Sequence, residues 1–307
     1  MRYFQDSDLG AAVTPEEMKA KLLDMLLVFD RFCEENGLRY YLSGGTLLGA
    51  IRHHGFIPWD DDIDVNMPRP DTDKLWELTH GKLGGYTLLP PNFTTYRHAY
   101  HYKLYDTTML VKKRRNLAPY PIFLDIFPIE GLPDTEEGNI EHYKEIAKWK
   151  NLAGKIWREP RDFGKNLPKR IAYYLRSLPA KRYGREELFN RVTGVMRSIP
   201  FDSAEYVGVM ATKVHTTEER VKKSEFCSAI KVDFEGHKLN GPAGYDAYLR
   251  QLFGENYMEL PPVEMRKSHH LKPYMAKEGL ADSAATIGML GLIKSENLGE
   301  IFIAKSL

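Results

Sequence analysis

The sequence has little cysteine, no long apolar run and almost no net charge, and each of these absences argues against a class of protein. The two cysteines, Cys33 and Cys227, lie far apart, so neither a disulfide framework nor a cysteine-rich zinc site is expected. No apolar run approaches the roughly 20 residues of a membrane-spanning helix, and the N-terminus lacks the apolar core of a signal peptide. With 43 Lys and Arg against 42 Asp and Glu, the net charge of +1 gives no bulk attraction to nucleic acid. We therefore expect a cytoplasmic protein that does not bind nucleic acid, with peripheral attachment at the inner face of the membrane left open.

The most informative stretch runs from Tyr40 to Met67 and contains a cluster of acidic residues. Residues 60–64 read Asp-Asp-Asp-Ile-Asp, with no Lys or Arg inside the cluster. At an effective dielectric constant near 20, two charges about 6 Å apart repel by roughly 3 kcal/mol, so the gathered carboxylates need a compensating cation. A hard divalent ion such as Mg²⁺ prefers oxygen ligands and would supply that charge. A solvated acidic loop is the alternative that the cluster alone leaves open.

The residues that follow place two of these aspartates on one side of a strand. Asp62 and Asp64 alternate with Ile63 and Val65, and successive side chains of a strand point to opposite faces. The two aspartates would then share one face, while the two apolar side chains enter a core. Asp60 is expected on the loop that leads into this strand.

A glycine turn precedes the acidic cluster. The apolar run Tyr40–Leu42 predicts a strand, Ser43–Gly45 a turn, and Thr46–His53 a helix that Ser43 or Thr46 caps. Glycines let the backbone approach a ligand closely, and a helix N-terminus offers N–H groups to a phosphate. A phosphate-binding turn followed by a metal-binding strand is a far more specific combination than either feature alone.

A third acidic position lies in an apolar run farther along the chain. Residues 122–128, IFLDIFP, predict a strand with Asp125 as its one acid. A lone carboxylate inside such a run is unfavourable unless it is paired. We expect Asp125 to join Asp62 and Asp64 from the neighbouring strand; a carboxylate satisfied by backbone N–H groups is the alternative. Glu130 is near enough to share the task.

These motifs together resemble a known family. The stretch SGGTLLGAIRHHGFIPWDDDID resembles the LicD family of the nucleotidyltransferase superfamily, and FLDIFPIEGLPD and GYDAYLRQLFGENYMELPPVEMRKSHH follow in the family's order. The resemblance covers roughly Met18 to His270. It implies an α/β (α+β) fold, with a nucleotidyltransferase-like mixed sheet, flanking helices and a helical insertion. It also implies transfer of phosphocholine from CDP-choline to cell-surface glycans or their lipid-linked precursors.

The resemblance gives the candidate residues their roles. Asp62, Asp64 and Asp125 would be the catalytic residues and would hold Mg²⁺, with Mn²⁺ as an alternative metal and Asp60 as a further ligand. In the superfamily the third acid either completes the metal shell or accepts the proton of the attacking hydroxyl. The residues expected to contact the substrate are Ser43, Gly44, Gly45, Thr46, Arg52, Lys267 and His270.

Two other function classes remain open at this stage. A nucleotidyltransferase that moves a nucleotide would use the same metal chemistry. A non-catalytic binding module would keep the fold and lose the chemistry, although all three acids are present here.

The chain is expected to divide into four parts. Residues 1–134 form the catalytic core, 135–200 a helical subdomain, and 201–275 a part that closes the active site; residues 276–307 form a tail without an assigned role. Within the subdomain, Trp149 to Trp157 predict an amphipathic helix that suits either a core or a membrane surface. The aromatic residues considered for contact with a quaternary ammonium group are Phe234, Tyr245, Tyr248 and Tyr257.

Overall fold

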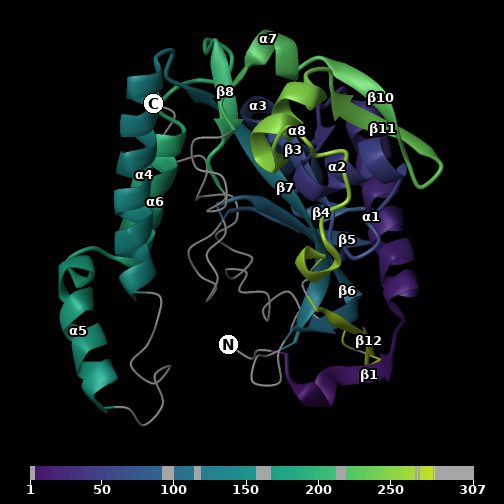
Figure 1. Ribbon diagram of the computed structural model, residues 1–307. Helices are drawn as coiled ribbons and strands as arrows, with labels where there is room; N and C mark the ends of the chain where they lie inside the picture. Colours follow the sequence, from purple (N-terminus) through teal and green to yellow (C-terminus); the bar gives the residue numbers. More distant parts are fainter. Residues whose placement is uncertain are drawn as a thin grey trace.

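The computed structural model describes residues 4–91, 100–113, 119–156, 167–211, 219–266, 268, 270–278 and 280. It shows a large mixed β-sheet with helices packed around it and a separate group of helices at one side (Figure 1). The mixed α/β class expected from the sequence is confirmed. In the part of the chain described here, no helix is long and apolar enough to cross a membrane.

The first long helix has a defined cap at each end. In α1 (Pro15–Asn36), the Thr14 hydroxyl accepts a hydrogen bond from the Glu17 N–H, and the Glu17 carboxylate accepts one from the Thr14 N–H. Gly37 ends the helix in the left-handed conformation, with φ of 61°. The apolar face packs against the sheet as expected. Its buried residues are Met18, Leu22, Met25, Leu26, Phe29 and Cys33.

The central strands of the sheet are long and change partners along their length. The main path runs β2–β3–β7–β6–β12–β1, while β5 and β4 extend from β6, and β8 and β9 extend from β7. A short hairpin of β10 and β11 stands apart. The strands are β1 (Leu9–Ala12), β2 (Tyr41–Leu42), β3 (Asp64–Pro68), β4 (Lys82–Leu83), β5 (Tyr86–Leu89), β6 (Tyr102–Lys112), β7 (Tyr120–Leu132), β8 (Tyr206–Val209), β9 (Val221–Lys222), β10 (Ala229–Phe234), β11 (His237–Pro242) and β12 (Lys272–Ala276).

Strand register brings two of the predicted acids together. β3 and β7 are parallel neighbours, and Asp64 pairs with Asp125 in that register. Ile63 and Val65, on either side of Asp64, are fully buried in the core, as the alternation predicts. β3 begins only at Asp64, so Asp62 belongs to the segment that leads into the strand.

Three helices form the side group seen in Figure 1: α4 (Glu136–Ile156), α5 (Leu167–Lys181) and α6 (Arg185–Met196). Tyr143 and Ile146 of α4 pack with Val192 and Met196 of α6 around a small second core. Pro179 was expected to separate two helices, but it lies within the last turn of α5. The other helices are α2 (Gly44–His53), α3 (Arg69–Thr79), α7 (Lys223–Phe226) and α8 (Tyr245–Phe253).

The C-terminal part returns to the main sheet instead of forming a layer of its own. β8 pairs with the end of β7, and β12 pairs with β6. Residues 1–134 and 201–275 therefore contribute to one sheet. The strand at β12 had no alternating pattern by which to predict it. The tail from residue 281 onward lies outside the described residues.

Candidate active site

The glycine turn and the acidic strand are hydrogen-bonded to each other. Ser43 stands at the N-cap position of α2, and Gly44 adopts a φ of 48°, which favours glycine. The Ser43 N–H donates to the Asp64 carbonyl at 3.0 Å, and the Asp64 N–H donates to the Thr46 hydroxyl at 2.9 Å. These two bonds fix the first turn of α2, with its N–H groups lacking intrahelical partners, beside the start of β3.

Carboxylates from two strands and their approach loop line one cavity of about 310 Å³ next to this turn. Asp60, Asp62, Asp64 and Asp125 all contribute to its wall, so the structure brings together the acids that the sequence singled out. The remaining lining residues are Ser43, Gly44, Gly45, Asn66, Phe127, Val209, Glu219, Tyr248, Leu252 and Phe253.

The two paired aspartates have opposite electrostatic environments. Burial raises the pKa of Asp64 well above its usual value, and the nearby carboxylates of Asp62 and Asp125 raise it further. Burial also acts to raise the pKa of Asp125, but Lys103 and His101 outweigh it and lower that pKa to about 2. Asp125 is therefore ionised at neutral pH, while Asp64 retains its proton more readily.

Asp125 is held by two side chains from the neighbouring strand β6 and the residue before it. The Lys103 ammonium forms an ion pair with its carboxylate, and the His101 Nε2 lies 2.9 Å from the same oxygen. The imidazole of His101 packs on Phe127, with ring centroids 4.5 Å apart. Burial lowers the pKa of His101, so at neutral pH Lys103 supplies most of the positive charge beside Asp125.

The donor set suits a hard divalent cation. Four aspartates supply carboxylate oxygens to the cavity wall, and the buried Asn66 side-chain oxygen in the same wall has no hydrogen-bond partner. The mutual repulsion that raises the pKa of Asp64 would be relieved by a cation placed among Asp60, Asp62 and Asp64. Within the described ranges, however, no three His, Cys, Asp or Glu side chains already converge on one point that could hold a metal ion. Metal binding would therefore require side-chain rotation around the cavity.

Other predicted substrate contacts lie away from the cavity. Thr46 is buried in α2 and holds the Asp64 backbone instead of facing the cavity. Arg52 donates to the carbonyls of Tyr257 and Glu259, at 2.8 and 3.0 Å, and so ties α2 to the segment after α8. His270 is exposed and does not line the cavity. Lys267 lies outside the described residues.

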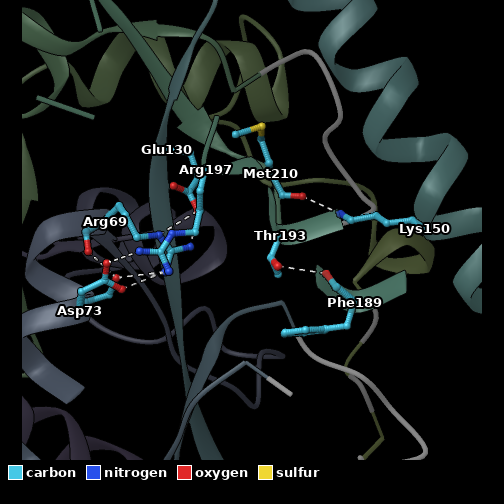
Figure 2. Close-up of polar contacts among 9 residues, drawn as sticks. Arg69, Asp73, Glu130, Lys150, Phe189, Thr193, Arg197 and Met210 are labelled. Carbon is cyan, nitrogen blue, oxygen red and sulfur yellow. Dashed lines mark hydrogen bonds and ion pairs between the residues drawn. The ribbon is translucent and has the colours of Figure 1, made fainter. Parts of the chain in front are cut away.

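Glu130, which the sequence left as a candidate to assist Asp125, has a structural partner. It is buried and forms an ion pair with Arg69 (Figure 2). Arg69 also lies 3.6 Å from Asp73, which in turn accepts a 2.6 Å hydrogen bond from Arg197. This network joins β7 to α3 and to the residue after α6, and it does not line the cavity.

Of the four aromatic residues considered for a quaternary ammonium contact, only Tyr248 lines the cavity. Its hydroxyl lies 3.2 Å from the Ser43 hydroxyl and 3.4 Å from the Asn66 amide nitrogen, which fixes the ring against the glycine turn. Phe234 is fully buried against Phe56. Tyr257 is also buried and donates to Asp246 at 2.8 Å, while Tyr245 packs against the main core.

Several residues in or beside the cavity were not assigned to the site from the sequence. Asn66 and Glu219 of the wall, and Lys103 beside Asp125, are single polar residues without a motif. Phe127, Leu252 and Phe253 belong to ordinary apolar runs. Asn66 and Phe127 carried a usable signal, because each lies two residues after an aspartate of the site, Asp64 or Asp125, and therefore on the same face of its strand.

Replacement of Gly45 by Ala is expected to weaken substrate binding while the fold persists. A Cβ at Gly45 would lie 2.8 Å from the Asp60 carboxylate, which must move away from the turn. Because Asp60 ends in a flexible carboxylate, we expect a melting temperature within about 2 °C of wild type, a change of less than ~1 kcal/mol. The KM for a phosphate-bearing substrate should rise about 10-fold, or ~1.4 kcal/mol, if the turn binds that phosphate.

Gly194→Ala is the matched control, because a Cβ there meets nothing within 4 Å. An unchanged KM in Gly45→Ala, measured beside this control, would show that the turn does not contact the substrate.

Comparison with known proteins agrees with the geometry. Residues 37–153, which include the glycine turn, the acidic cluster and Asp125, match the family described as LicD/FKTN/FKRP, nucleotidyltransferase domain. The lipopolysaccharide cholinephosphotransferase LicD of Haemophilus influenzae is 27% identical over 270 residues, which are 85% of this chain and 97% of that protein. Residues 37–153 therefore match a LicD-family domain, and most of the chain is similar to a LicD cholinephosphotransferase.

Other relatives match the chain over much shorter stretches. The human ribitol 5-phosphate transferase FKRP is 43% identical over 51 residues, which are 17% of this chain and 10% of that protein. Mannosyltransferase regulator 4 of Saccharomyces cerevisiae is 40% identical over 53 residues, covering 17% of this chain and 4% of that protein.

Proposed function

We propose that this LicD-family phosphotransferase moves phosphocholine, or a related phospho-alcohol, from a CDP-alcohol to a hydroxyl of a cell-surface glycan or its lipid-linked precursor. The observation that carries the proposal is the placement of carboxylates from two adjacent strands opposite a helix N-terminus across one cavity. The match to the cholinephosphotransferase of Haemophilus influenzae extends over nearly the whole of that protein, which supports a related reaction.

The acids would hold a divalent metal and the diphosphate. Asp62 and Asp64 are the proposed ligands of Mg²⁺, or Mn²⁺ in its place, with Asp125 and Asp60 completing the shell. When bound, the ion would neutralise the carboxylates and the diphosphate charge. A pKa of about 2 makes Asp125 a poor proton acceptor near pH 7, so we assign it to ligation and to the positioning of Lys103.

The turn and β6 would supply positive charge to the phosphates. N–H groups at the start of α2, beside Gly44 and Gly45, would bind the phosphate of the leaving nucleotide. Lys103, now paired with Asp125, lies close enough to share its charge with the transferred group. The acceptor hydroxyl oxygen would attack the phosphorus that bears the alcohol, and the bond from that phosphorus to the bridging oxygen would break. CMP would leave with the bridging oxygen, and the proton of the hydroxyl would pass to solvent.

The cavity wall also includes apolar surface that suits a quaternary ammonium head group. Phe127, Tyr248 and Phe253 supply aromatic surface, and Val209 and Leu252 supply aliphatic surface. Glu219 adds a buried carboxylate to the same wall. Cation–π contacts are worth roughly 0.5–2 kcal/mol each, which favours choline over an uncharged polyol.

Phosphorus NMR over a panel of CDP-alcohols tests this function. With CDP-choline, a glycan acceptor and Mg²⁺, we expect CMP and a new phosphodiester signal, and both should be absent in the Asp62→Asn variant. A CDP-polyol should react more slowly. If pyrophosphate appears instead, from CTP and a phosphorylated alcohol, the protein is a nucleotidyltransferase. Absence of any turnover, together with no Mg²⁺-dependent heat on nucleotide titration, would indicate a binding module.

A further inference from the structure

Helix α5 exposes an apolar face to solvent. A helix of a water-soluble domain ordinarily turns such a face toward a core. In α5 only Ser177 and Ala180 are buried, and both are small. The large apolar side chains are instead exposed to between 43% and 60%. They are Leu167, Ile171, Tyr174, Leu175 and Leu178.

These five side chains form one continuous stripe. At about 100° per residue, they fall within an arc of about 100°, while Ser177 and Ala180 lie on the roughly opposite side. The buried side faces α4, where the Tyr173 hydroxyl donates to the Lys155 carbonyl. The stripe therefore points away from the described protein, at the far end of the helical group from the sheet (Figure 1).

The charges around the stripe all have one sign. Between residues 167 and 184 the chain has no Asp or Glu. Lys181 lies over the Tyr174 ring, with its ammonium 4.0 Å from the ring centroid, so positive charge borders the stripe directly. The basic residues of this segment are Lys169, Arg170, Arg176, Lys181 and Arg182.

For the segment from Trp149 to Trp157 the sequence left a core and a membrane surface open, and the described part of it packs in a core; Trp157 lies outside the described residues. Trp149, Leu152 and Ile156 of α4 pack with Ala153 and Leu188 in a small cluster. Their apolar face is thus used to join α4 to α6. The surface suited to lipid lies on the next helix instead.

We propose that α5 docks this protein onto the surface of a membrane that contains anionic lipids. The exposed leucines, isoleucine and tyrosine enter the boundary between head groups and acyl chains. The basic residues that border the stripe contact lipid phosphates; they are Arg170, Lys181 and Arg182. α5 has 15 residues and five nearby cations, so it lies in the plane of the membrane and does not span it. Charge complementarity selects lipid over a second copy of this chain, because two α5 helices would bring like charges together. The inference does not depend on which alcohol is transferred.

Flotation of the full-length protein with vesicles tests the proposal. We expect binding to phosphatidylcholine vesicles that contain about 30% phosphatidylglycerol, weaker binding to pure phosphatidylcholine, and loss of the difference in high salt. The double variant Ile171→Glu/Leu175→Glu should reduce binding at least 10-fold. The matched control is Leu78→Glu/Ile140→Glu, which adds the same charges at exposed apolar positions outside α5 and should bind as wild type does.

A second measurement tests the proposal even if the double variant Ile171→Glu/Leu175→Glu folds poorly. Leu175→Trp should show a blue shift of its added fluorescence on anionic vesicles, whereas Leu78→Trp should not. Equal binding of the two double variants, or no shift in Leu175→Trp, would overturn the proposal. So would a dimer in light scattering that Ile171→Glu/Leu175→Glu dissociates, since the stripe would then be a subunit interface. Transfer to a water-soluble acceptor should be unchanged in these variants, which separates failure of docking from failure of the reaction.

Discussion

The Asp64→Asn variant is expected to lose turnover by on the order of 1,000-fold or more, equivalent to about 4 kcal/mol, while its metal-free fold becomes more stable at neutral pH. Loss of activity follows because Asp64 stands at the start of β3, in register with Asp125 and beside Asp62. An amide cannot replace the negative charge that a divalent metal requires there. Asp62→Asn should lose activity to a similar degree.

The gain in stability follows from the sign of the pKa shift. The folded protein raises the pKa of Asp64, so the folded state prefers the protonated form. The contribution of protonated Asp64 to stability is complete below the pKa that Asp64 has in the unfolded chain. It is lost as the pH rises through the pKa that Asp64 has in the folded state. Asparagine resembles the protonated acid and does not ionise. The advantage of Asp64→Asn should therefore grow with pH and reach a few degrees in melting temperature, on the order of 1 kcal/mol.

Differential scanning calorimetry in EDTA across a pH series measures this effect. Added Mg²⁺ should raise the melting temperature of the wild type and not of Asp64→Asn, because binding stabilises only the protein that has the site. Asp233→Asn is the control, since Asp233 lies on the exposed hairpin and pairs with Lys238 at 2.8 Å. Retained turnover in Asp64→Asn would refute the assignment of the metal site.

The second large effect concerns the buried pair of Arg69 and Glu130. Arg69→Met should destabilise the protein by about 3–5 kcal/mol, because it leaves the Glu130 carboxylate buried without its partner. Burial by itself lowers the pKa of Arg69, but Glu130 outweighs this and raises it, so the guanidinium is charged. At about 2–4 °C per kcal/mol, the expected drop in melting temperature is of order 10 °C.

The double variant Arg69→Met/Glu130→Met provides the matched comparison. Removing both charges leaves no unpaired group, so most of the lost stability should return. Activity per folded molecule should be largely retained in both variants, because neither residue lines the cavity. A Glu130→Gln variant that melts as wild type does but fails to turn over would show instead that Glu130 assists Asp125 in catalysis.

Local patterns predicted several elements because their causes lie within a few residues. The start of α1 depends on residues 14–17 alone, where Thr14 and Glu17 form a capping box, and the apolar spacing of the helix matches its buried face. Alternation around Asp64 placed Ile63 and Val65 in the core. The start of α2 was expected at Thr46 and lies at Gly44, because the Ser43 backbone is held by the Asp64 carbonyl, which is distant in sequence.

The contacts that single polar residues make with distant parts of the chain could not be predicted from local patterns. Lys103 and His101 meet Asp125 only because β6 and β7 are antiparallel neighbours, with Lys103 opposite Asp125 in the register. Arg52 was expected at the phosphates, but the path of the chain after α8 offers it two backbone carbonyls instead. A strand of five residues such as β12 forms because β6 presents an edge to it, and no property of its own sequence required this.

The sequence by itself determined the resemblance to the LicD family, the acids and the glycine turn, because clustered carboxylates and a helix start are local features with few physical explanations. Only the tertiary structure decided how these features face one another. Strand register set Asp64 against Asp125, Lys103 gave Asp125 its low pKa, and the packing of α4 against α6 left α5 with an exposed apolar stripe. Each of these contacts joins residues far apart in the chain, where local propensity has no influence.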